Sequence, residues 1–211
     1  MQTRLLARFL AGAAALAAGL GGVPAQAGAA TTWTVSPGGS ATAKATAGTI
    51  TLTDTSTGAV GTCASSKATG TVKKGSGLSG QDIGKVTAAA FGSCVALGSV
   101  PLTVTSRDLP WRISFTSYNA KTEVVRGTVS GVRVMLTGSC QAVVNGSSGS
   151  AADGVITAVY NDRIGQLTFL TSGSNLHYWH VKNCGGLIND GDPVALTASY
   201  TIRPIQDITS P

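Results

Sequence analysis

Apolar and polar residues alternate with a period of two along much of the chain, which is the pattern of strands that bury one face. The run Ile50-Thr-Leu-Thr-Asp54 shows it clearly, and a Thr-Ser-Thr-Gly turn then reverses the chain. By the same pattern we expect further strands at 31–35, 60–63, 68–72, 85–91, 102–106, 113–119, 124–129, 131–136, 156–161, 167–170, 176–183 and 194–202. Segments 75–84 and 145–153, which are rich in Gly and Ser, are expected to be loops.

These elements predict an all-β fold, either an antiparallel sandwich or a barrel-like structure built from hairpins. The hairpins at 50–63, 113–129 and 156–170 resemble one another, so two pseudo-repeated halves are one expectation. Glutamate occurs once, at Glu123, and charged residues make up 11% of the chain, so helices with charged faces are not expected. No long charged or proline-rich linker divides the sequence, and residues 28–211 are therefore expected to form one domain.

Residues 1–27 have the features of a secretory signal peptide. Arg4 and Arg8 precede an apolar run from Phe9 to Val23, and Ala25-Gln-Ala27 follows as a cleavage site. We therefore expect a secreted, extracellular protein that has no membrane span in its mature chain.

Four cysteines in an exported chain indicate two disulfides, for which three pairings are possible. We expect Cys63 to pair with Cys94 and Cys140 with Cys184, because the sequences flanking the two pairs resemble each other. Metal ligation by the thiolates is not favoured, because the chain has no C-x-x-C pair.

Charge and motifs exclude several functions. The formal net charge of +6 falls by two when the signal peptide is removed, and the remaining basic residues are scattered, so nucleic acid is not an expected partner. The hydrolase motifs G-x-S-x-G, H-E-x-x-H and S-x-x-K are absent from the sequence. No cofactor and no metal is expected.

The stretch 174–202 carries the most chemistry, because it holds both histidines, a tryptophan and the last cysteine. Strict alternation would place Tyr178, His180 and Lys182 on one face of a strand, and His177 and Trp179 on the other. The two histidines are then on opposite faces, which argues against a shared metal ion. Burial of the larger side chain favours Trp179 in the core. Tyr178, His180 and Lys182 would form an exposed binding strip, and two further aromatic side chains, Trp111 and Tyr118, are candidate contacts.

Several segments resemble a group of small secreted β-rich proteins of actinomycete-type bacteria, which have no assigned activity. The resemblance rests on the signal peptide and on residues 33–39, 77–84, 109–111, 175–177 and 184–189. It implies secretion and a β fold, and it supplies no catalytic residue.

Three functions follow as hypotheses. The first is a non-enzymatic extracellular binding or structural module whose partner is a glycan or an extracellular protein. The second is a secreted hydrolase with a site assembled by the fold around His177 or His180. The third is a β-barrel of the cell envelope.

Overall fold

A computed structural model describes residues 31–211 except 47, 49 and 97–98, and the signal peptide prediction lies outside these residues. Residues Thr31–Pro211 form one compact unit. No helix in the described part of the chain is long and apolar enough to cross a membrane. The strands are β1 (Thr32–Ser36), β2 (Gly39–Ala45), β3 (Ile50–Asp54), β4 (Val60–Val72), β5 (Gly75–Ser79), β6 (Gly84–Ala96), β7 (Val100–Arg107), β8 (Trp111–Asn119), β9 (Val124–Gly138), β10 (Gln141–Asn145), β11 (Gly154–Asn161), β12 (Gln166–Leu170), β13 (His177–Lys182), β14 (Val194–Arg203) and β15 (Asp207–Thr209).

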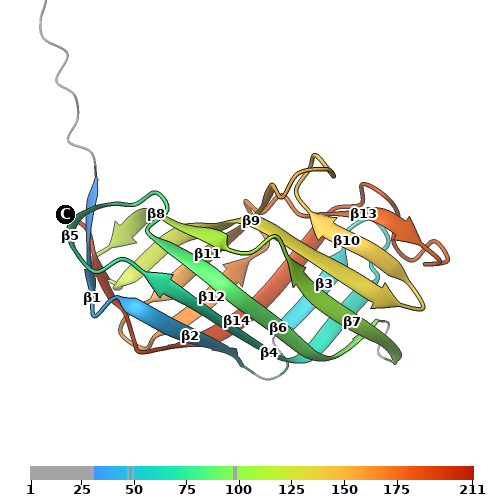
Figure 1. Ribbon diagram of the computed structural model, residues 1–211, viewed down its shortest axis with the longest axis horizontal. Coiled ribbons are helices and arrows are strands. Elements are labelled where there is room, and N and C mark those ends of the chain that lie inside the picture. Colours follow the sequence, from blue (N-terminus) through green and yellow to red (C-terminus); the bar gives the residue numbers. More distant parts are fainter. Residues whose placement is uncertain (1–30, 47, 49, 97–98) are drawn as a thin grey trace, which may run out of the picture. The chain divides into compact units, whose positions relative to one another are not determined.

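Twelve of these strands form a closed antiparallel barrel with eight strand positions (Figure 1). Neighbouring positions follow one another along the chain, and β14 closes the barrel by pairing with β2 and β3. The all-β prediction is confirmed, and of its two alternatives the structure has the barrel. A closed sheet leaves no unpaired edge within the barrel wall.

The barrel wall has eight strand positions around its circumference. Four of these positions each hold one long strand, and each of the other four holds two shorter strands placed end to end. The continuous strands are β4, β6, β9 and β14, and the divided positions are β2/β3, β7/β8, β10/β11 and β12/β13. The N-terminal part of β9 pairs with β8 and β11, while its C-terminal part pairs with β7 and β10. Each long strand thus runs through both halves of an elongated barrel. The sequence predicted 124–129 and 131–136 as separate strands, but they are one strand with a bulge at Gly131, which has φ 78° and lies where the register with β11 shifts.

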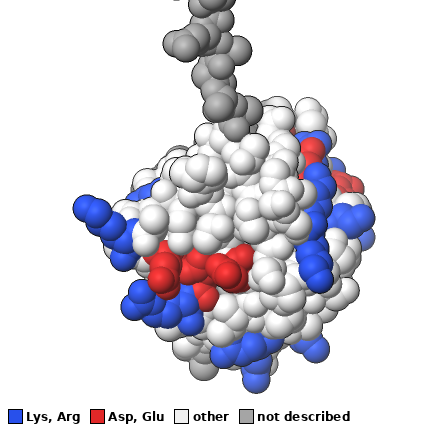
Figure 2. All heavy atoms as spheres, turned by 90° about the vertical axis from the view of Figure 1, so that its left-hand side faces the viewer, with Lys and Arg blue, Asp and Glu red and all other residues white. Residues whose placement is uncertain are grey.

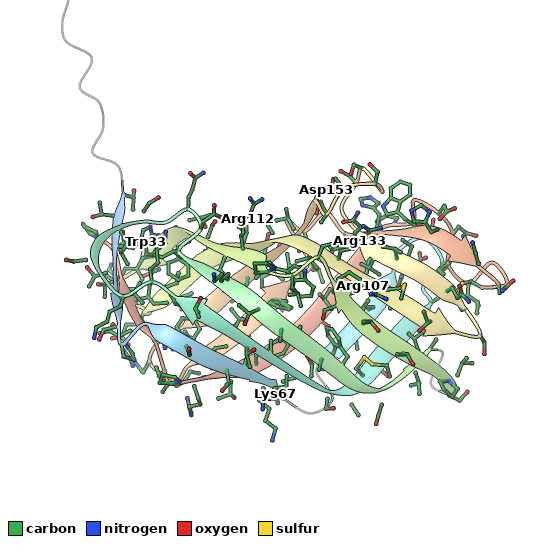
Figure 3. The ribbon with its side chains drawn as sticks, in the orientation of Figure 1. Trp33, Lys67, Arg107, Arg112, Arg133 and Asp153 are labelled. Atoms are coloured by element: carbon green, nitrogen blue, oxygen red, sulfur yellow. A yellow bond between two sulfur atoms is a disulfide. The ribbon has the colours of Figure 1, made fainter. Side chains whose placement is uncertain are left out.

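A separate three-stranded sheet, β15-β1-β5, covers one end of the barrel. Trp33 and Val35 of β1 are buried and pack with Ile83, Ile208 and two barrel side chains, Val125 and Tyr160. Trp33 lies at this end in Figure 3, and its ring centroid is 5.2 Å from that of Phe115. We call this sheet the cap.

Segment 75–84 was expected to be a loop, but Gly75–Ser79 is strand β5, because β1 supplies its hydrogen-bonding partner.

Both predicted disulfides are present and both lie at the barrel end opposite the cap. Cys63–Cys94 joins directly paired residues of β4 and β6, and Cys140–Cys184 joins the β9–β10 turn to the residues after β13. The chain has no other cysteine.

Candidate functional site

A row of small side chains crosses the inner wall of the barrel. Ala43 of β2 pairs with Ala68 of β4, which pairs with Ala89 of β6. All three side chains face the interior and line one cavity. The neighbouring Lys67 points away from the barrel (Figure 3), as alternation along a strand requires. Three adjacent strands therefore contribute methyl groups where a well-filled barrel would carry Val, Ile or Leu.

The cavity beside this row has a volume of about 190 Å³. Its wall also includes large apolar side chains, among them Phe91 of β6, Trp111 of β8, Phe169 of β12 and Leu196 of β14. Several inward-facing residues of this wall, such as Phe91 and Leu196, are only half-buried even though they lie inside the barrel. The interior is thus incompletely filled by its own side chains.

The volume and chemistry of the cavity limit what it can hold. An apolar cavity of about 150 Å³ in a protein core stays dry and accepts benzene, while drug-sized ligands need roughly 300 Å³ or more. At about 190 Å³, this cavity fits a molecule of one ring with a short substituent, or an aliphatic molecule of similar size.

A second apolar pocket of about 280 Å³ lies at the disulfide end. Leu52 and Val104 line both pockets, so the two meet at these side chains. Val60 and Leu187 of the second pocket are 38% and 42% exposed, so this pocket borders solvent. The cap covers the other end, and the disulfide end is therefore the side from which a molecule can approach the interior.

The segment 183–192 follows β13, and its first part, residues 183–188, forms one wall of this entrance. The Thr57 hydroxyl donates to the Leu187 carbonyl oxygen (2.6 Å), and the Cys140–Cys184 disulfide fixes the start of the segment. Near its end, Asn189 donates to the carboxylate of Asp192 through its backbone and side-chain nitrogens (2.8 and 2.9 Å). The side-chain hydrogen bond from Asn189 is the main cause that lowers the pKa of Asp192.

Tyr178 lies under this segment, which reverses the predicted orientation of β13. Tyr178 is 4% exposed and lines the entrance pocket, whereas Trp179 is only half-buried, so the prediction that Trp179 occupies the core is wrong. Burial is the main cause that raises the pKa of Tyr178, and the charges of Asp54 and Asp192 raise it further. The size of the side chain did not decide which residue is buried. A bulge after Trp179 also turns Val181 to the side of Tyr178: His180 has φ 54°, and the register between β10 and β13 shifts beside it.

The predicted binding strip is therefore reduced to His180 and Lys182, which are exposed. Trp111 is buried rather than exposed, lines the barrel cavity and donates its indole N–H to the Arg107 carbonyl oxygen (2.9 Å). Tyr118 is half-buried and packs against the buried side chains between the cap and the barrel, which include Trp33 and Val125. Sequence reasoning thus selected two aromatic residues that line pockets, Trp111 and Tyr178, but assigned both to the outer surface.

The two histidines have different surroundings. His177 Nδ1 lies 2.9 Å from the Asn175 carbonyl oxygen, and its ring centroid is 6.3 Å from that of Trp179. His180 is exposed. Among the residues that the structure describes, no hydrogen bond joins either histidine to a serine hydroxyl or a carboxylate, and no group of three or more His, Cys, Asp or Glu side chains is placed to hold a metal ion.

Figure 2 looks onto the capped end, where acidic side chains gather near the middle and basic side chains lie around them. Burial is the main cause that raises the pKa of Asp162 at this end, and the charges of Glu123 and Asp207 raise it further. Glu123 also accepts a hydrogen bond from Arg163 (2.9 Å), so part of this charge is neutralised.

Comparison with known proteins gave no matching family model, no significantly similar curated protein and no significantly similar solved structure. The barrel cavity is therefore the feature from which we infer a function.

Proposed function

We propose that this protein is a secreted, non-enzymatic binding protein whose barrel interior holds a small apolar molecule. The observation that carries the proposal is the row Ala43, Ala68 and Ala89, which leaves an apolar cavity of about 190 Å³ inside a closed barrel. Closed eight-stranded barrels have room for their own side chains or for one small ligand, and here the side chains leave space. The signal peptide features and the two disulfides support an oxidising compartment outside the cell.

An unfilled cavity lowers the stability of the fold, which supports a binding function for it. Unfilled apolar space sacrifices dispersion contacts of the surrounding atoms, and filling such a space is a common way to stabilise a protein. Replacing a single alanine of the row with a larger apolar residue would fill part of the cavity. A bound apolar molecule makes the same contacts without a change of sequence.

The test is binding of small hydrocarbons, with benzene and toluene as probes. A ligand that binds only the folded state raises stability by about 2.7 kcal/mol at 100 times its Kd, so the midpoint of thermal unfolding should rise with probe concentration. In Ala68→Leu, three added carbon atoms occupy the cavity and the shift should disappear. Ala90→Leu is the matched control, because Ala90 is an exposed neighbour on β6 and its shift should equal that of the wild type.

Equal shifts in the wild type and in Ala68→Leu would place the probes outside the barrel and overturn the proposal. The absence of any shift at saturating probe concentration would overturn it as well.

A further inference from the structure

Two hydroxyl groups lie together in the wall of the otherwise apolar cavity. Ser66 of β4 and Tyr200 of β14 both line it, and their oxygens are 3.2 Å apart in a hydrogen bond. They are 5% and 6% exposed. Ala45 lies on the strand between them, paired with Tyr200, and its small side chain lets the tyrosine hydroxyl reach across β2 to Ser66.

This pair has one hydrogen more than it uses. Each hydroxyl carries one hydrogen, and the bond between the two oxygens consumes one of them, whichever group donates. No further hydrogen bond of either side chain is found among the described residues, so the second hydroxyl hydrogen has no acceptor there. A buried donor without an acceptor is unfavourable, and an acceptor atom brought by a ligand would satisfy it.

The second tyrosine of the same wall, Tyr160, has no such spare donor. The Tyr160 hydroxyl donates to the Gln206 carbonyl oxygen (3.1 Å) and accepts from the Gln206 backbone N–H (2.9 Å). The Gln206 side chain accepts from the Gly38 N–H and donates to the Pro204 carbonyl oxygen. The Tyr160 hydroxyl is thus fully engaged, whereas the Ser66–Tyr200 pair keeps one unused hydroxyl hydrogen.

We propose that the ligand of the barrel interior is an apolar molecule with one hydrogen-bond acceptor, such as a carbonyl or ether oxygen, which the Ser66–Tyr200 hydroxyl pair binds. This inference rests on the proposed function, because it requires that the cavity is occupied. The hydroxyl pair fixes the orientation of the ligand, while the apolar wall contributes most of the binding. A pocket that is mainly apolar with a few placed polar groups is the usual form of a small-molecule site.

A pair of probes with the same shape separates the two contributions. Acetophenone and 2-phenylpropene differ only in a carbonyl oxygen against a methylene group, and both are one ring with a short substituent. The measured quantity is the ratio of the two dissociation constants, obtained by titration calorimetry or by ligand-induced shifts in NMR spectra.

The decisive variant is the double substitution Ser66→Ala and Tyr200→Phe. Either single variant keeps one free hydroxyl hydrogen, so only the double variant removes the donor. Replacing both partners of a hydrogen bond with apolar groups of similar shape can leave the stability nearly unchanged, so the double variant should remain folded. We expect the preference for acetophenone, relative to 2-phenylpropene, to fall by about 2- to 10-fold. Tyr118→Phe is the control, because Tyr118 is not one of the residues that line the cavity, and its ratio should match the wild type.

The outcomes distinguish this inference from the proposed function. If the wild type binds neither probe, the proposed function fails and this inference fails with it. If both probes bind and the ratio is the same in the wild type and the double variant, the cavity binds apolar molecules and the acceptor site alone is refuted. An equal loss of preference in Tyr118→Phe would also refute it, because the effect would not be specific to the hydroxyl pair.

Discussion

Substitution of Tyr178 and Trp179 with alanine tests which face of β13 belongs to the core. Tyr178 is 4% exposed, lines the entrance pocket and belongs to the main core cluster. An aromatic side chain buries roughly 150–250 Å², which at about 25 cal/mol per Å² corresponds to about 4–6 kcal/mol as an upper bound. Measured losses for such substitutions are about 3–5 kcal/mol, and we expect Tyr178→Ala to fall in that range.

Trp179 is the larger residue but should contribute less. Its ring is half-buried against the loop before β11, where its indole N–H donates to the Gly146 carbonyl oxygen (2.8 Å). Trp179→Ala removes this hydrogen bond and part of the apolar contact with the loop. We expect a loss of about 1–2 kcal/mol.

The measurement is urea unfolding of both variants with linear extrapolation to zero denaturant. Tyr178→Phe is the control, because it keeps the ring and removes only the hydroxyl, and it should lose far less stability than Tyr178→Ala. A loss for Trp179→Ala that equals or exceeds that for Tyr178→Ala would show that the assignment of the inner face is wrong.

Three further predictions concern the cavity, a disulfide and pH. Ala68→Leu should raise the free energy of unfolding by about 1–2 kcal/mol, because burial of three added carbons at about 0.8 kcal/mol each outweighs the loss of rotamer freedom of the leucine. Denaturant unfolding measures this change, and a loss of stability would show that the cavity has no room for the added carbons. Replacing Cys140 and Cys184 together with serine should cost about 4 kcal/mol in the chain-entropy model, because the bridge closes a loop with a sequence separation of 44 residues; an unchanged unfolding midpoint would contradict this. The lowered pKa of Asp192 means that its charged form stabilises the fold at neutral pH and that this stabilisation is lost as pH falls through the lowered pKa. Wild type should therefore be more stable than Asp192→Asn at pH 7, with a difference that shrinks below about pH 4 in thermal melts; a difference independent of pH would refute the assignment.

Local pattern was sufficient for much of the architecture. Alternation located β3 at Ile50–Asp54 with its observed bounds, and it placed β8, β11, β12 and β14 to within a few residues. The similar flanks of the cysteines predicted both disulfides correctly. These features depend on near neighbours in the chain, because strand propensity and turn chemistry are local properties.

Short strands with few large apolar residues escaped this reasoning. Gly39–Ala45 and Gly75–Ser79 consist mainly of Gly, Ser, Ala and Thr, with Leu78 the one large apolar residue, and β15 has only three residues. They are strands because β4, β14 and β1 supply hydrogen-bonding partners from distant parts of the sequence. A weak local preference gives way to such tertiary pairing.

The sequence by itself determined that the chain alternates, turns and crosslinks as an all-β protein, but not which face of each strand looks inward. In β13 the left-handed backbone at His180 interrupts the alternation, so Tyr178 and Val181, three residues apart, both pack against the core. The cavity likewise depends on register, because Ala43, Ala68 and Ala89 become neighbours only when three strands align. A period of two defines two faces of a strand, whereas closure of the barrel decides which face is buried and which small side chains meet across it.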